Sequence, residues 1–180
     1  MKKQLIIYGS HYGTTKAYAE KLSERTGLPV SNYETITDLS DYEEIIHLGG
    51  LYAGGVKGLG RTLKALPQSA SLILVTVGLA DVTKKENTDH IKDAIRKQVP
   101  QNVLDRTTMF HLRGGIDYKR LNFLHKAMMA MVHKKLKSIP EGQRSAEDRD
   151  MLDTYKKRAD FVDFETLGEL VAFLKRGCRM

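Results

Sequence analysis

Short apolar runs alternate with segments of helical spacing along this 180-residue chain, and that alternation constrains the fold more than any other feature. The runs predicted as strands are Leu5–Tyr8, Leu28–Tyr33, Glu44–Leu48, Leu72–Val77 and Thr107–Leu112. The segments with helical spacing are Thr14–Arg25, Leu59–Leu66, Asn87–Gln98 and Thr166–Arg176. Strands that alternate with helices in this way predict an α/β fold with a doubly wound parallel sheet.

The composition limits the class of protein. Hydrophobic residues make up 41% and charged residues 28%, which is ordinary for a soluble globular chain. No apolar run approaches the roughly 20 residues that cross a bilayer. Cys178 is the only cysteine, which excludes an internal disulfide, and the histidines show no metal-type spacing. We therefore expect one domain over residues 1–180, a cytoplasmic location, no metal and no hydrolase-type catalytic site.

The loop after the first strand suits an anion. It reads Ser10-His11-Tyr12-Gly13-Thr14-Thr15 and stands directly between a strand and a helix. Its hydroxyl groups and the free N–H groups of a helix N-terminus suit a phosphate dianion, and Gly13 lets the backbone approach closely. The loop matches neither the Walker pattern nor the dinucleotide fingerprint. The alternative interpretation is that Ser10, Thr14 and Thr15 only favour the start of a helix.

Two later loops also follow predicted strands, at the edge where such sheets bind ligands. The glycine-rich segment Gly49–Gly58 allows the backbone to lie against a planar ligand, and Tyr52 can stack on a ring; the alternative is a flexible connector. The loop Gly78–Asp81 is small and can line the other side of the ring. The residues predicted to contact the ligand in these loops are Gly50, Leu51, Tyr52, Ala53, Gly54, Gly55, Gly78, Leu79 and Ala80.

The segment Tyr8–Thr15 resembles the FMN-phosphate loop of flavodoxins, a hydroxyl-rich turn after the first strand. The segments Phe110–Tyr118 and Asp160–Glu165 are similar to the menaquinone-dependent protoporphyrinogen dehydrogenase family. The resemblance covers essentially the whole chain. It implies a flavodoxin-like sheet of five parallel strands in the order 2-1-3-4-5, with a helical insertion at residues 119–159 in the fifth-strand region. His11 and Tyr12 depart from the Arg-Asp pair of that family.

The resemblance implies that the three loops hold FMN, and so predicts an FMN-dependent oxidoreductase. Protoporphyrinogen IX is the candidate substrate and a quinone the acceptor. One alternative is a flavodoxin-like electron-transfer protein with a protein redox partner, and another is a non-enzymatic docking module. The net charge of +7 argues against the plain shuttle, because ordinary flavodoxins are acidic. No side chain is assigned a catalytic role, since the flavin ring supplies the redox chemistry.

The segment Lys119–Lys137 contains Lys and Arg residues but no acid. A helical wheel places one group of apolar residues together, namely Leu121, Leu124, Met128, Met131 and Val132. It places a basic group on another face, namely Lys119, Lys126, His133 and Lys137. This pattern predicts peripheral contact with an anionic membrane or an acidic partner; the alternative is that the apolar face packs on the domain. The following segment, Ser138–Asp153, is predicted to be a polar loop, and no nucleic-acid partner is expected.

Overall fold

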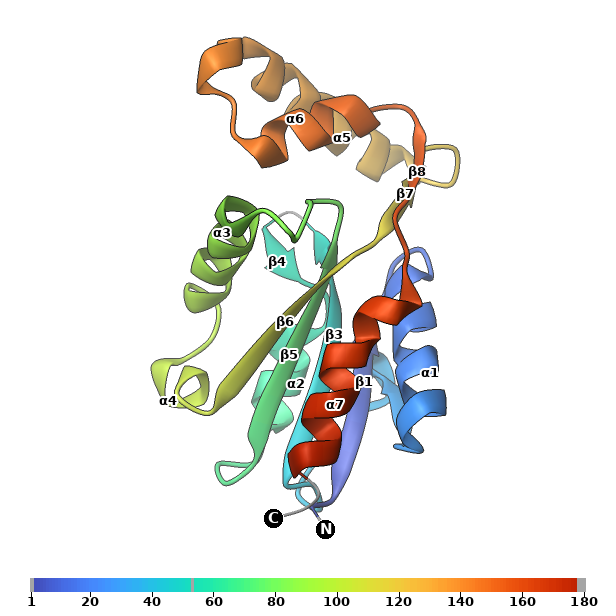
Figure 1. Cartoon of the computed structure of the whole chain (residues 1–180), viewed down its shortest axis with the longest axis vertical. Helices are drawn as coiled ribbons and strands as arrows, with labels where there is room; N and C mark the ends of the chain where they lie inside the picture. Colours follow the sequence, from blue (N-terminus) through green and yellow to red (C-terminus); the bar gives the residue numbers. More distant parts are fainter. Residues whose placement is uncertain (1, 53, 178–180) are drawn as a thin grey trace.

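The computed structural model describes residues 2–52 and 54–177. Its centre is a parallel sheet in the order β2-β1-β3-β5-β6, shown in Figure 1. The strands are β1 (Gln4–Gly9), β2 (Val30–Asn32), β3 (Glu44–Tyr52), β5 (Ser71–Gly78) and β6 (Thr107–Arg113). A short strand, β4 (Gly55–Val56), pairs antiparallel with the end of β3 and lies off this path. The predicted α/β fold and the order 2-1-3-4-5 of the main strands are therefore confirmed.

Helices cover both faces of the sheet because successive strand residues point to opposite sides. Ile6, Ile46 and Ile73 are buried on one face, in a cluster with residues of α1 (Thr14–Thr26) and α7 (Gly168–Gly177). Ile7, Ile45 and Leu74 are buried on the other. The elements on that second side are η1 (Tyr33–Thr35), α2 (Leu59–Ala65), α3 (Lys85–Arg96) and α4 (Gln101–Leu104). Both faces are apolar, so the central strands read as nearly continuous hydrophobic runs.

Strand β3 is longer than the sequence predicts. It was expected to end at Leu48 and continues to Tyr52, so that much of the predicted glycine-rich loop is strand and tight turn. Gly49 and Gly50 pair in register with Thr76 and Val77 of β5. A Cβ atom at Gly49 would lie 2.1 Å from Cγ1 of Val56, so the missing side chain allows β4 to fold back closely.

After β6 the chain leaves the sheet and forms a separate helical unit. This insertion, Gly115–Asp160, consists of β7 (Gly115–Asp117), α5 (Phe123–Ser138), η2 (Glu141–Gln143), α6 (Ala146–Thr154) and β8 (Arg158–Asp160). β7 and β8 pair antiparallel, with Gly115 opposite Asp160, and form a narrow neck. Figure 1 shows α5 and α6 beyond the carboxyl ends of the sheet strands. No helix within residues 2–52 and 54–177 is long and apolar enough to cross a membrane.

Two predictions for the insertion are wrong. Part of the segment expected as a polar loop is helix α6, which Ser145 and Asp148 start with a reciprocal capping box. The predicted apolar face of α5 is also divided: Met128 is half-buried, whereas Leu124 and Met131 are 72% and 70% exposed. The helix carries apolar residues on both sides, so a wheel drawn from the sequence alone cannot tell which side packs.

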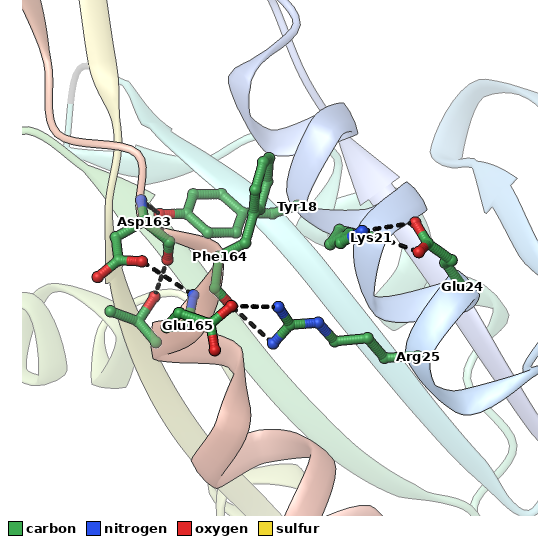
Figure 2. A network of polar contacts seen from close by, with 8 residues as sticks. Tyr18, Lys21, Glu24, Arg25, Asp163, Phe164 and Glu165 are labelled. Carbon is green, nitrogen blue, oxygen red and sulfur yellow. Dashed lines mark hydrogen bonds and ion pairs between the residues drawn. The ribbon is translucent and has the colours of Figure 1, made fainter.

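Tyr18 of α1 holds both ends of the insertion. Its buried hydroxyl donates to the carbonyl of Arg113 at 2.8 Å and accepts from the backbone N–H of Asp163 at 3.0 Å. Arg25 reinforces the second contact, since it donates to the carbonyl of Phe164 at 2.9 Å, in η3 (Phe164–Leu167), and pairs with Glu165 (Figure 2). Residues of α1 therefore hold both the end of β6, where the chain leaves the sheet, and the segment that leads back into η3 and α7.

Candidate functional site

A cavity of about 210 Å³ lies at the carboxyl ends of the sheet strands, between the three predicted loops and the insertion. The predicted residues that line it are Ser10, His11, Tyr12, Thr14, Thr15, Gly50, Leu51, Tyr52, Gly78, Leu79 and Ala80. Gly13 shapes the first loop, whereas Gly54 and Gly55 lie in the turn and strand beyond Tyr52, away from the cavity lining. Ala53 lies outside the described residues. The loops thus meet at one place although the sequence separates them.

The first loop leaves the start of α1 open to an anion. Gly13 is the N-cap residue, with φ +97° in the left-handed region, and no side chain in the described structure caps the helix. Ser10 instead accepts the N–H of Gly13 at 3.1 Å, which shapes the loop. The first turn of α1 carries no acidic residue, so its amide dipoles meet no competing negative charge. The hydroxyls of Ser10, Thr14 and Thr15 are therefore not used as helix caps here.

The second and third loops pack against each other across the sheet edge. A Cβ atom at Gly78 would lie 2.8 Å from Cδ1 of Leu51, so glycine is what permits this contact. The third loop is also held from β6, because Arg113 Nε donates to the carbonyl of Leu79 at 3.0 Å and Gly114 N–H donates to Gly78 at 2.6 Å. Backbone and small apolar side chains therefore form a close, fixed surface here.

The insertion supplies a fourth wall of the cavity, which the sequence did not predict. Its residues that line the cavity are Gly115, Ile116, Leu121, His125, Met128, Met129, Asp150 and Met151, with Gly114 just before it. Asp150 is engaged at the third loop, since it accepts from the N–H of Asp81 at 3.4 Å and pairs with Lys84 at 3.6 Å. The sequence offers one indication of this wall. The amphipathic segment Lys119–Lys137 follows the predicted strand Thr107–Leu112, which ends at the same edge of the sheet as the other strands.

Four aromatic rings from three parts of the chain meet at the cavity. Tyr52 lies 4.5 Å from His125 and 5.1 Å from His11, between ring centroids, and His11 lies 5.2 Å from His125. The hydroxyl of Tyr12 contacts Nδ1 of His125. Burial, with Lys57 and His125 nearby, lowers the pKa of His11, and burial raises the pKa of Tyr52. Both shifts favour uncharged rings, which suit contact with a planar aromatic ligand.

Within residues 2–52 and 54–177, no group of three or more His, Cys, Asp or Glu side chains is placed to hold a metal ion. The cavity combines a helix N-terminus for an anion with a flat apolar and aromatic space. That combination suits a ligand with a phosphate at one end and a planar ring at the other.

The chain is similar to several solved structures. A flavoprotein in complex with FMN from Lactobacillus acidophilus NCFM is 14% identical, with 63% of this chain and 93% of that chain covered and a TM-score of 0.46. A flavodoxin from the domain Archaea is 13% identical, with coverages of 61% and 82% and a TM-score of 0.41. A mutant of flavodoxin from Pseudomonas aeruginosa is 18% identical, with coverages of 61% and 83% and a TM-score of 0.40.

No curated protein matches the chain. A family model does match, over residues 5–141, and its description is the flavodoxin domain. This match runs from β1 through α5 and therefore includes all of the loops that line the cavity. The chain belongs to the flavodoxin-domain family.

Proposed function

We propose that this protein is an FMN-dependent oxidoreductase that acts on a small apolar molecule beneath the insertion. The observation that carries the proposal is the cavity in which the flavodoxin loops face Leu121, Met128 and Met129 of the insertion. The cofactor is FMN, which the family match and the chemistry of the first loop both support.

The residues present fit FMN. The phosphate would be held by the first-turn amides of α1 and by the hydroxyls of Ser10, Thr14 and Thr15. The ring would lie among Leu51 and Tyr52 of the second loop and the short third loop. When bound, the isoalloxazine ring supplies the electron transfer.

The chain's own residues bind and orient the cofactor and keep water from it. The thioethers of Met128, Met129 and Met151 give an apolar surface that adapts to the shape of a substrate. Among the described residues that line the cavity, Asp150 is the only acid, and its carboxylate is already engaged with Lys84 and the third loop. The substrate space is therefore mostly apolar and suits the ring system of a substrate, whose charged substituents would stay on the solvent side.

The position of the insertion favours a small molecule over a protein redox partner. A protein partner must approach the flavin edge directly, and α5 and α6 stand in front of that end of the sheet (Figure 1). This counts against the alternative of an electron-transfer shuttle. Within the small-molecule class, the resemblance of Phe110–Tyr118 and Asp160–Glu165 makes a porphyrinogen the specific candidate substrate, with a quinone as acceptor.

The first experiment is titration of the purified protein with FMN and with riboflavin, followed by flavin fluorescence and absorption. We expect FMN to bind much more tightly, because riboflavin lacks the phosphate. Equal affinities would contradict the phosphate assignment.

The second experiment separates the enzymatic activities. The FMN-loaded protein is mixed with protoporphyrinogen IX and a soluble naphthoquinone, and porphyrin fluorescence is followed. Turnover that depends on both FMN and the quinone supports the porphyrinogen assignment. Electron transfer to a protein acceptor, without porphyrinogen turnover, would instead identify the shuttle.

A further inference from the structure

We propose that the outer face of α5 docks this protein on an anionic lipid bilayer. Phe123, Leu124 and Met131 are 88%, 72% and 70% exposed, and among the described residues they are the exposed large apolar side chains. All of them lie on this one helix. Such a concentration of exposed apolar surface marks an interaction site, because single scattered residues would be the ordinary case.

The same face is strongly basic. Lys126, Lys134, Lys135 and Lys137 are exposed, and α5 contains no acidic residue. Lys119 and Arg120, just before the helix, are exposed as well. Apolar anchors beside several lysines are the pattern of a helix that lies in the interface of a bilayer.

The opposite side of α5 explains why this face is free. His125, Met128 and Met129 line the cavity, and Leu136 is buried. The helix therefore packs on the protein through that side. Leu124 and Met131 are seven positions apart, two helical turns, so they lie above one another on the outer side. Phe123 and Ala127 are next to them on that side, and both are exposed.

The positive charge of this face favours an anionic bilayer over a second copy of the chain as its binding partner. A symmetric contact between two copies would place this lysine-rich face against itself, and like charges across an interface are unfavourable. Anionic headgroups neutralise the lysines, and the acyl region accepts Phe123, Leu124 and Met131 without a matching protein surface. The docking does not depend on the proposed redox activity. If the docking and the proposed redox activity are both correct, the insertion that covers the cavity faces the lipid, in which an apolar substrate dissolves.

The test is co-sedimentation of the full-length protein with vesicles of phosphatidylglycerol and phosphatidylcholine, and with vesicles of phosphatidylcholine alone, at low and high salt. We expect binding to the anionic vesicles at low salt and weaker binding as salt rises. One variant combines Lys126→Gln, Lys134→Gln and Lys137→Gln. Each lysine contributes about fivefold to partitioning, so this variant should bind on the order of 100-fold more weakly.

A second variant combines Phe123→Ser, Leu124→Ser and Met131→Ser, and should also lose binding, because the apolar anchors are removed from exposed positions without disturbing the core. The matched control combines Lys64→Gln, Lys97→Gln and Lys175→Gln, which removes the same charge from exposed lysines outside α5. The control should bind as the unmodified protein does. Circular dichroism checks that each variant is folded.

Failure to bind anionic vesicles at low salt would overturn the proposal. A loss of binding in the control as large as that in the lysine variant would also overturn it, because net charge alone would then explain the attraction. A dimer that the apolar variant abolishes, in the absence of vesicle binding, would assign the face to contact between copies. Capture of a soluble acidic protein without vesicle binding would assign it to that class of partner.

Discussion

The hydroxyl of Tyr18 donates a 2.8 Å hydrogen bond to the carbonyl of Arg113, the last residue of the sheet before the insertion. The same oxygen accepts from the N–H of Asp163, after the insertion has ended. One buried phenol therefore bridges two points that the sequence places far apart. These two hydrogen bonds fix both ends of the insertion to α1 of the flavodoxin domain.

Tyr18→Phe tests this anchor. The ring remains, with its edge-to-face contact on Phe164, but the carbonyl of Arg113 and the amide of Asp163 lose a partner in a buried place. Such a loss costs about 1–3 kcal/mol of unfolding free energy. Urea denaturation measures it. The control is Tyr33→Phe, because the Tyr33 hydroxyl contacts Glu34 at an exposed position. Equal unfolding free energies for the two variants would show that the buried Tyr18 hydroxyl stabilises the protein no more than the exposed Tyr33 hydroxyl does.

The phosphate loop is tested by Ser10→Ala and Thr15→Ala. Each hydroxyl that donates to the phosphate of FMN contributes a charge-assisted hydrogen bond of about 1.5–3 kcal/mol, so each variant should weaken FMN binding by roughly 10-fold or more. Riboflavin affinity should stay the same, because the lost contacts are to phosphate. Thr88→Ala is the control, since that hydroxyl donates to the carbonyl of Lys85 at an exposed position of α3. Flavin fluorescence titration measures all three. A parallel loss of riboflavin affinity would locate the defect in the ring site.

The insertion should be separable from the sheet. Asp117 and Arg158 face each other in the neck, so an Asn-Gly turn can join them in place of residues 118–157. Among the described residues, neither hydrophobic cluster of the sheet draws on that segment. We expect a folded protein that still binds FMN, with the ring more accessible to iodide quenching. An unfolded product, seen by circular dichroism, would show that the helices belong to the core.

Stability should fall in mild acid because of His47. This side chain is fully buried, with Nε2 3.0 Å from the carbonyl of Lys57 and Nδ1 2.9 Å from the hydroxyl of Thr62, and burial lowers its pKa from 6.5 to about 4. The unfolded chain therefore binds a proton that the folded chain refuses between pH 6.5 and 4. The stability is fully present above pH 6.5 and declines as the pH falls, by about 3 kcal/mol from this residue.

Urea denaturation at a series of pH values checks this expectation, with His47→Gln as the informative variant. Gln can replace part of the hydrogen bonding but does not titrate, so the slope of stability against pH should become shallower. His111, whose pKa burial also lowers to about 4, contributes in the same direction and remains in the variant. An unchanged slope would exclude His47 as a source of acid sensitivity.

Much of the sheet could be predicted because its physical signal is local. Runs such as Leu72–Val77 are apolar on both faces, and the helices between them carry one apolar side, so strand positions follow from short windows, whereas the order of the strands was implied only by the resemblance to flavodoxins. The end of β3 could not be placed in this way. Gly49 and Gly50 have low strand preference, and only their pairing with β5 keeps them extended.

The site was predictable only on the side of the loops. Ser10 and Leu79 each follow a strand directly and Tyr52 is the last residue of one, and parallel strands bring their carboxyl ends to one edge. His125 contacts Tyr12 although the two residues are 113 positions apart, and the sequence near either residue does not predict that contact. The side on which α5 packs depends on such distant contacts, so the helical wheel was misleading.

The paired neck of Gly115 and Asp160 means that the chain departs and returns at nearly one point. A segment whose two ends already lie together places little strain on the host, and its length can change at small entropic cost. Different helical units could therefore be exchanged at this position in the course of evolution while the sheet below stayed intact. The proposed substrate space and the proposed membrane contact would then be inherited together, on one replaceable piece of chain, independently of the loops that hold the cofactor.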